Sequence, residues 1–183
     1  MGGSLKSQEI IDIKTRDKYK NIKNFVETGT YKADTTILAS KHYDNVYTTE
    51  IHEPLFVESK LRAQSEGVNN IKFYLGDSLN NLPAIMSELV GGSVFFLDAH
   101  ISGNDSSWNG TIRVPLIEEL NIILKYKLGP SIFIFDDLRL WKTVKAFDWV
   151  HITNDYLIQI IQSSGFKVVE SYEKDDRFYV YIE

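Results

Sequence analysis

Residues 93–98 read Ser-Val-Phe-Phe-Leu-Asp, and residues 131–137 read Ser-Ile-Phe-Ile-Phe-Asp-Asp. Both runs are almost wholly apolar until they reach aspartate, which is typical of central strands covered on both faces of a sheet. Similar runs and stretches with a helical pattern alternate along the chain. The expected strands are 24–28, 45–51, 71–75, 93–97 and 131–135, and the expected helices are 33–43, 54–66, 82–90 and 114–127. This alternation predicts an α/β fold with right-handed crossovers and a parallel sheet.

The two ends of the chain have different patterns. A helix is expected over 153–164, followed by alternating runs at 166–172 and 177–183 that a short polar turn joins into an antiparallel hairpin. Residues 7–23 are mostly polar and predict either a helix packed on one edge or a flap over the site. We therefore expect an N-terminal helix or flap, 1–22, and one ligand-binding domain, 23–183.

The composition is that of an ordinary globular protein, and 183 residues suit a single domain. The formal net charge of −5 argues against a large nucleic-acid surface, because phosphate binding needs clustered lysine and arginine. Since cysteine is absent, disulfides, thiolate zinc sites and cysteine nucleophiles are excluded. The sequence has no apolar run near the roughly 20 residues that span a bilayer, and residues 1–4 do not read as a signal peptide. We therefore expect a cytoplasmic protein that binds neither nucleic acid nor membrane.

Acidic residues and a glycine mark the carboxyl ends of the expected strands, where ligands bind in open α/β sheets. These residues are Glu27, Gly29, Glu50, Asp77, Asp98, Asp136 and Asp137. A buried carboxylate is costly unless it is paired or bound. The pattern therefore predicts a polar ligand site along one edge of an apolar scaffold.

The loop after the first strand limits the kind of ligand. Gly29 is its only glycine, so the dinucleotide pattern G-x-G-x-x-G is absent, which disfavours NAD and favours a ligand without a pyrophosphate. Glu50 lies about 20 residues later, where a carboxylate can accept both hydroxyls of a ribose; a helix-capping or surface acid is the alternative. Asp77 can accept from an adenine amino group, or it can be a helix N-cap.

The order Glu27-Thr28-Gly29-Thr30, Glu50, Gly76-Asp77-Ser78, Phe96-Leu97-Asp98 and Phe135-Asp136-Asp137 resembles the class I S-adenosylmethionine-dependent methyltransferases. That resemblance implies a Rossmann-like sheet of seven strands in the order 3-2-1-4-5-7-6, mostly parallel, with an antiparallel C-terminal hairpin. It also implies that Glu27 and Gly29 line the methionine part of the cofactor, that Glu50 holds the ribose, and that Asp77 and Ser78 meet the adenine. The residues expected to bind the cofactor are Glu27, Thr28, Gly29, Thr30, Tyr31, Glu50, Ile51, Gly76, Asp77, Ser78 and Asp98.

A second group consists of Asp98, His100, Asp136 and Asp137. Three carboxylates brought together repel one another unless a cation lies among them, and oxygen ligands suit Mg²⁺, Ca²⁺ or Mn²⁺. The group is similar to that of metal-dependent sugar and macrolide O-methyltransferases, which implies that Asp98, Asp136 and Asp137 bind Mg²⁺. His100 stands where those enzymes have their proposed general base, so Asp98 and His100 are the expected catalytic residues. Alternatively, Asp98 contacts the cofactor without a metal and His100 is structural.

We therefore expect metal-assisted transfer of a methyl group from S-adenosylmethionine to a sugar or another small hydroxyl compound. A metal-independent methyltransferase, or a non-catalytic or cofactor-cleaving protein that binds S-adenosylmethionine, are the alternatives. The polar loop 101–113 with Trp108, and the segment 138–155 with Trp141 and Trp149, are expected acceptor walls; a solvated loop and core aromatics are their alternatives. Because few residues are left to cap the pocket, a homodimer is one way to close it.

Overall fold

The computed structural model describes residues 4–100, 112–143 and 149–183. Most of the expected acceptor loop 101–113, with Trp108, lies outside these residues. The described chain forms one seven-stranded sheet in the order β3-β2-β1-β4-β5-β7-β6. The strands are β1 (Asn24–Thr28), β2 (Asn45–Glu50), β3 (Ile71–Leu75), β4 (Ser93–Leu97), β5 (Ser131–Phe135), β6 (Val168–Lys174) and β7 (Arg177–Ile182). This order and the antiparallel hairpin confirm the predicted fold.

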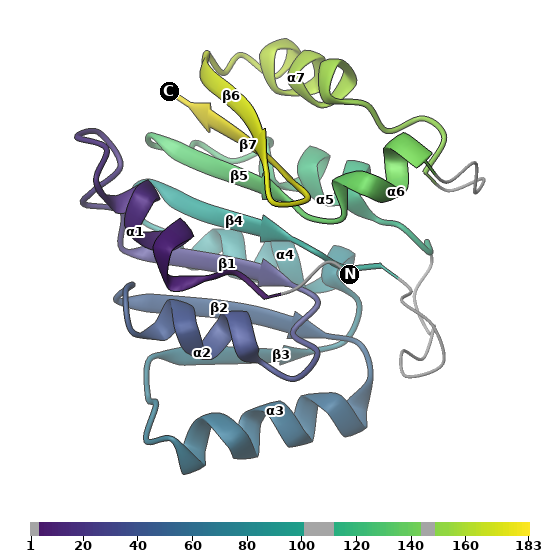
Figure 1. Cartoon of the computed structure of the whole chain (residues 1–183). Helices are drawn as coiled ribbons and strands as arrows, with labels where there is room; N and C mark the ends of the chain where they lie inside the picture. Colours follow the sequence, from purple (N-terminus) through teal and green to yellow (C-terminus); the bar gives the residue numbers. More distant parts are fainter. Residues whose placement is uncertain (1–3, 101–111, 144–148) are drawn as a thin grey trace.

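The first five strands run parallel, and β7 pairs antiparallel with both β5 and β6. In Figure 1 the carboxyl ends of β1 to β4 therefore lie together on one side of the sheet. Every residue of β1, β4 and β5 is buried, so buried and exposed residues do not alternate along these strands. Helices cover both faces of these central strands.

Helices form one layer on each face of the sheet. They are α1 (Ser7–Lys14), α2 (Asp34–Ser40), α3 (Glu53–Ser65), α4 (Ser78–Glu88), α5 (Leu116–Ile123), α6 (Leu138–Thr143) and α7 (Asn154–Ser163). In Figure 1, α1 and α2 lie in front of the sheet and α4 and α5 behind it. The larger core cluster joins the sheet to α4, α5 and α7, and a second cluster joins the other face to α1 and α2.

Side-chain alternation along each strand decides which face a residue serves. Val26 belongs to the core shared with α4 and α5, whereas Phe25 belongs to the core shared with α1 and α2. At the end of the same strand, Glu27 therefore turns toward α2 and Thr28 turns toward α5. Their hydrogen bonds agree, since Glu27 accepts from Thr36 and Thr28 donates to Glu119.

The C-terminal hairpin differs from the prediction in its turn. β6 continues to Lys174, and the turn consists of Asp175 and Asp176 with φ angles of 51° and 67°. Two consecutive residues with positive φ match the twist of a tight hairpin, and aspartate tolerates this conformation. Residues 173–176, Glu-Lys-Asp-Asp, therefore supply both the strand end and the turn.

Residues 7–14 form a helix that packs on the sheet face. Ile10 and Ile13 are fully buried in the second core cluster, together with Leu5 from the preceding segment. Leu5 also donates its backbone N–H to Thr35 Oγ1 at 3.0 Å, close to the start of α2. None of the helices in the described ranges combines the length and apolar character needed to cross a bilayer.

Candidate functional site

The carboxyl ends of five strands form one continuous edge. Gly29 donates its N–H to Thr49 O at 3.0 Å, and Asp98 N–H donates to Thr28 O at 3.2 Å. Further along, Gly76 N–H reaches Glu50 O at 2.8 Å and Asp136 N–H reaches Leu97 O at 3.2 Å. The acids at the strand ends are thus brought along one side of the sheet.

The loop after β1 turns tightly and lies against β4. Gly29 has a φ of 84°, and a Cβ there would lie 2.8 Å from the carbonyl oxygen of Asp98. Tyr31 and Ala33 also have positive φ angles, of 47° and 64°, which are uncommon for residues with a side chain. Strained backbone of this kind tends to occur where a ligand is held.

Glu27 is buried beneath this loop, with 1% of its surface exposed. One carboxylate oxygen accepts from the hydroxyls of Thr36 and of Thr48, the latter at 2.6 Å. Burial raises the pKa of Glu27 to about 7, although these two hydrogen bonds lower it. Its predicted contact with the methionine part of a cofactor stays a prediction.

Glu50 holds the same loop from the end of β2. Its two carboxylate oxygens accept the N–H of Tyr31 at 2.7 Å and the N–H of His52 at 2.9 Å. Each oxygen has a second lone pair, so hydrogen bonds from two ribose hydroxyls remain chemically open. Glu50 is 6% exposed and therefore lies just beneath the surface of this edge.

Asp77 begins α4. Its Oδ1 accepts the N–H of Leu79 at 2.9 Å, so the helix N-cap that the sequence offered as an alternative is present. A capping carboxylate retains acceptor capacity, and the adenine contact stays a prediction. The next residue, Ser78, is buried, whereas Gly76 and Ile51 are partly exposed at the same edge.

His100 lies between two aspartates. Its Nε2 is 2.9 Å from Asp137 Oδ2, and its Nδ1 is 3.6 Å from Asp98 Oδ1. The imidazole is 11% exposed and packs edge-on against Trp149, with 5.4 Å between the ring centroids. This geometry fixes the ring with one nitrogen against Asp137 and the other turned toward Asp98.

The charges around these aspartates differ. Burial and the neighbouring Asp136, Asp137 and Glu27 raise the pKa of Asp98 well above its usual value. Burial also acts to raise the pKa of Asp137, but the hydrogen bond from His100 and the charge of Arg139 outweigh it and lower that pKa. Of these three carboxyl groups, Asp98 therefore has the least positive charge nearby to balance its own negative charge.

Asp136 is paired with a buried arginine. Arg177 Nε lies 3.1 Å from Asp136 Oδ1, and Arg177 NH1 donates to Glu9 Oε1 at 2.8 Å. Tyr179 donates its hydroxyl to the same Glu9 oxygen at 2.6 Å. Burial raises the pKa of Asp136 to about 6, against the lowering effect of Arg177. This chain of contacts, Glu9–Arg177–Asp136, ties α1 and β7 to the site edge.

A second arginine serves Asp137. Arg139 forms ion pairs with both Asp137 and Asp176, and its backbone N–H donates to Asp176 Oδ1 at 2.7 Å. Asp176 belongs to the hairpin turn, and its carbonyl also accepts the N–H of Leu138 at 2.8 Å. The hairpin thereby holds the start of α6 beside the site.

The expected metal ligands are only partly assembled. Ligand atoms of Asp98, His100 and Asp137 lie within 4.8 Å of one another, whereas Asp136 is outside this group and pairs with Arg177. A site with one imidazole and two carboxylates fits a divalent cation that accepts nitrogen, such as Mn²⁺, better than it fits Mg²⁺. The residues present therefore fit a divalent cation if His100 takes the place of Asp136 among the expected ligands.

Sequence reasoning missed three buried residues of this region: Glu9, Glu119 and Arg177. Arg177 opens a strand whose other residues are apolar or aromatic, and all six residues of that strand are buried. Glu119 stands in the helical period of Leu116, Leu120 and Ile123, on the buried face of α5. A charged residue at a core position of the expected element is the signal that finds both.

The aromatic residues after β5 belong to the core. Trp141 and Trp149 are 9% and 7% exposed and join the larger core cluster, as the alternative interpretation held. Trp149 also contacts His100, so it borders the site from the core side. His151 and Arg113 are exposed.

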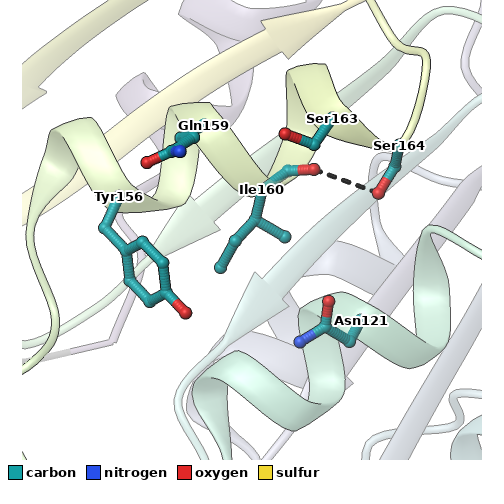
Figure 2. A pocket seen from close by; sticks show the side chains of 6 residues that line it. All are labelled: Asn121, Tyr156, Gln159, Ile160, Ser163 and Ser164. Atoms are coloured by element: carbon teal, nitrogen blue, oxygen red, sulfur yellow. Dashed lines mark hydrogen bonds between the residues drawn. The ribbon is translucent and has the colours of Figure 1, made fainter.

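A separate pocket of about 240 Å³ lies between α5 and α7. Figure 2 shows Tyr156 and Ile160 of α7 pointing toward Asn121 of α5, with Gln159 and Ser163 beside them on α7. Ser164 completes the lining, and none of the six residues belongs to the strand-end site. The pocket therefore adds nothing to the candidate site.

Solved structures of other proteins share the fold of this chain. TomG, an O-methyltransferase from Streptomyces achromogenes solved with S-adenosylmethionine, matches with a TM-score of 0.63 and 12% identity, covering 98% of this chain and 81% of that chain. An O-methyltransferase from Bacillus cereus, solved with S-adenosylhomocysteine, matches with a TM-score of 0.62 and 17% identity, covering 98% of this chain and 82% of that chain. The chain has the class I methyltransferase fold. No family model and no curated protein matches the sequence.

Proteins with this fold act on different kinds of acceptor. An rRNA methylase from Streptococcus thermophilus also matches, with a TM-score of 0.54 and 16% identity, covering 89% of this chain and 87% of that chain. Because identity is this low in every case, the likeness shows the class I methyltransferase fold and leaves the acceptor to be argued from the site itself.

Proposed function

We propose that the protein is an S-adenosylmethionine-dependent methyltransferase that methylates a hydroxyl group of a small acceptor such as a sugar. The proposal rests on one observation above all: His100 is held 2.9 Å from Asp137 at the sheet edge that also carries Gly29, Glu50 and Asp98. A base fixed by a carboxylate at the cofactor edge of this fold suits removal of a hydroxyl proton.

In the proposed reaction, Asp137 accepts the Nε2–H of His100, and Nδ1, on the side of Asp98, receives the proton of an acceptor hydroxyl bound beside that aspartate. Nδ1 takes the hydroxyl proton as the acceptor oxygen attacks the sulfonium methyl. The carbon–sulfur bond breaks, the carbon–oxygen bond forms, and S-adenosylhomocysteine leaves with the electron pair. Placing the two reactants in line supplies much of the rate, since no further chemical group is needed for the displacement.

A cation-assisted variant is the second candidate, and the grouping of Asp98, His100 and Asp137 within 4.8 Å favours it. These three residues would hold the ion, which when bound supplies Lewis acidity at the acceptor oxygen. His100 would then be a ligand and could not also accept the proton. Arg139 and Arg177 already compensate Asp137 and Asp136, so the remaining demand for positive charge lies at Asp98.

Cofactor binding is the first test. Titration calorimetry should detect binding of S-adenosylhomocysteine and S-adenosylmethionine to the wild-type protein. Glu50→Ala should weaken both strongly, whereas Glu53→Ala, an exposed glutamate three residues later, should not. If the wild-type protein binds neither compound at millimolar concentration, the proposed function is wrong.

Turnover is the second test, with release of S-adenosylhomocysteine measured over a panel of small hydroxyl compounds. His100→Ala should retain cofactor affinity and lose about a hundredfold or more in turnover, the loss typical of a missing general base. His151→Ala removes an exposed histidine and is the control. Normal turnover of His100→Ala would contradict the assigned base.

Chelation separates the two candidates. Activity that persists after exhaustive treatment with EDTA supports His100 as the base and removes the cation from the reaction. Activity that is lost, and is restored by Mn²⁺ more readily than by Mg²⁺, supports the cation held by Asp98, His100 and Asp137. An RNA substrate added to the panel tests the other class of acceptor, which the net charge of −5 disfavours. Gel filtration of the active protein tests the expected homodimer.

A further inference from the structure

A carboxyl group lies buried under the candidate site on the side of α5. Glu119 is 0% exposed and shares its helix face with Leu116, Leu120 and Ile123 of the larger core. Burying a carboxyl group among these side chains is costly unless hydrogen bonds hold it. The contacts of Glu119 therefore call for an explanation beyond packing.

Those contacts join segments that are far apart in the sequence. Thr28, the last residue of β1, donates its hydroxyl to Glu119 Oε2 at 3.1 Å. Ser78, the buried first residue of α4, lies close enough to the same carboxyl group to lower its pKa. Thr28 Oγ1 also accepts the backbone N–H of Asp98 at 3.3 Å, which adds the end of β4 to the chain of contacts.

The charge state of Glu119 follows from its surroundings. Burial raises its pKa to about 8, and Ser78 and the hydrogen bond from Thr28 lower it by less. Two acidic groups face it, Asp77 at the N-cap of α4 and Glu118 on its own helix, and both act in the raising direction. Among the described residues Glu119 Oε1 has no hydrogen-bond partner, which suits a neutral carboxyl better than a carboxylate.

We propose that Glu119 is a positioning residue that holds the end of β1 and the start of α4 at the separation that the cofactor needs. This inference rests on the proposed function, with Gly29, the residue after Thr28, expected at the methionine part of the cofactor and Asp77 and Ser78 expected at the adenine. One neutral carboxyl group accepts the hydrogen bond of Thr28 on one side, lies beside Ser78 on the other, and fixes the span between them. Ionisation places a charge in the core beside Asp77, so the carboxyl moves outward and releases both loops.

As a consequence, the affinity for the cofactor depends on pH, and the ionisation of Glu119 alone causes this dependence. If binding requires neutral Glu119, the affinity of the wild-type protein falls about tenfold for each pH unit above the pKa. Glu119→Gln keeps an uncharged acceptor for Thr28 beside Ser78 at every pH, so it escapes this fall. The ratio of the two affinities isolates Glu119, because ionisation of the ligand affects both proteins alike.

The experiment measures S-adenosylhomocysteine affinity by calorimetry between pH 6.5 and pH 9, for the wild-type protein, Glu119→Gln and Glu118→Gln. We expect the affinity of Glu119→Gln to equal that of the wild type at pH 6.5 and to exceed it about tenfold at pH 9. Glu118→Gln removes a charge one residue earlier but leaves Glu119 able to ionise, so its affinity should still fall with pH, starting at a slightly lower pH than in the wild type. Glu119→Ala should bind about tenfold more weakly at pH 6.5, because the hydrogen bond with Thr28 and the contact with Ser78 are lost.

The outcomes separate the inference from the proposed function. If the wild-type protein binds S-adenosylhomocysteine but the ratio for Glu119→Gln stays constant with pH, Glu119 is only structural and the inference is wrong. If Glu119→Ala fails to fold, Glu119→Gln still decides, because its amide fills the same volume. If the wild-type protein does not bind at all, the proposed function itself has failed.

Discussion

Replacing Arg177 with methionine tests how the buried ion pairs stabilise the protein. Arg177 is 2% exposed and lies between Glu9 and Asp136, which are 4% and 3% exposed. Methionine fills a similar volume but leaves both acids buried without their cation. Removing one partner of a buried pair typically costs about 3–5 kcal/mol, because the remaining charge is uncompensated. That loss is a large fraction of the roughly 5–15 kcal/mol that stabilises a typical domain.

Urea unfolding, followed by tryptophan fluorescence, measures the effect as a shift in the midpoint at unchanged slope. The control is Arg62→Met, because the Arg62 side chain is 39% exposed and pairs with Asp34 and Glu66 at the surface. Exposed pairs contribute about 0–1 kcal/mol, so the control should move the midpoint little. Adding Glu9→Gln to Arg177→Met should restore part of the loss by removing one stranded charge.

The reasoning would be refuted by either of two results. Equal losses in the free energy of unfolding for Arg177→Met and Arg62→Met would mean that burial of an ion pair does not decide how much it contributes to stability. A double variant, Glu9→Gln with Arg177→Met, that is less stable than Arg177→Met alone would mean that the stranded charge is not the source of the cost.

Three further predictions concern stability and the loops. Folded Glu119 holds a proton that the unfolded chain releases above pH 4.5, so its contribution is lost as pH rises toward its raised pKa of about 8. At 1.36 kcal/mol per pKa unit, Glu119→Gln should be up to about 3 kcal/mol more stable than the wild type at pH 7 and similar at pH 4.5, by urea unfolding at both. Gly29→Ala should lose about 1–3 kcal/mol of stability and bind S-adenosylhomocysteine more weakly, because its Cβ would lie 2.8 Å from Asp98 O. An unchanged affinity in titration calorimetry would contradict this close approach. Asp77→Ala should lose about 1 kcal/mol in thermal unfolding through the lost N-cap, and Asp77→Ser should recover most of it.

The sequence predicted the strands well because their signal is local. The runs 93–97 and 131–135 are short, almost wholly apolar and stopped by aspartate, and the run 24–28 is stopped by Gly29; the structure gives the same bounds for all three. Helix starts were less accurate. α4 begins at Ser78 because Asp77 caps it, whereas the apolar period becomes visible only from Leu82.

The site could be predicted only as far as strand ends allow. The sequence placed Asp98, Asp136 and Asp137 at the ends of the neighbouring strands β4 and β5, but only Asp98 and Asp137 join the group around His100. It could not show which cation each acid already has, since Arg177 comes from β7 and depends on side-chain reach across the sheet. Glu119 was missed for a similar reason, because the partner of a buried charge can lie anywhere in the chain.

The position of β7 has a consequence for synthesis of the protein on the ribosome. β7 inserts between β5 and β6, so until it emerges β5 is an edge strand of apolar residues open to pairing with other chains. The same strand delivers Arg177, so Asp136 lacks its cation over that interval. The nascent chain therefore passes through a stage in which most of the sheet can form. At that stage β5 is still an exposed apolar edge strand and the negative charge of Asp136 is not yet neutralised. Chaperone contact is most useful at that stage, before residue 182 is free of the exit tunnel.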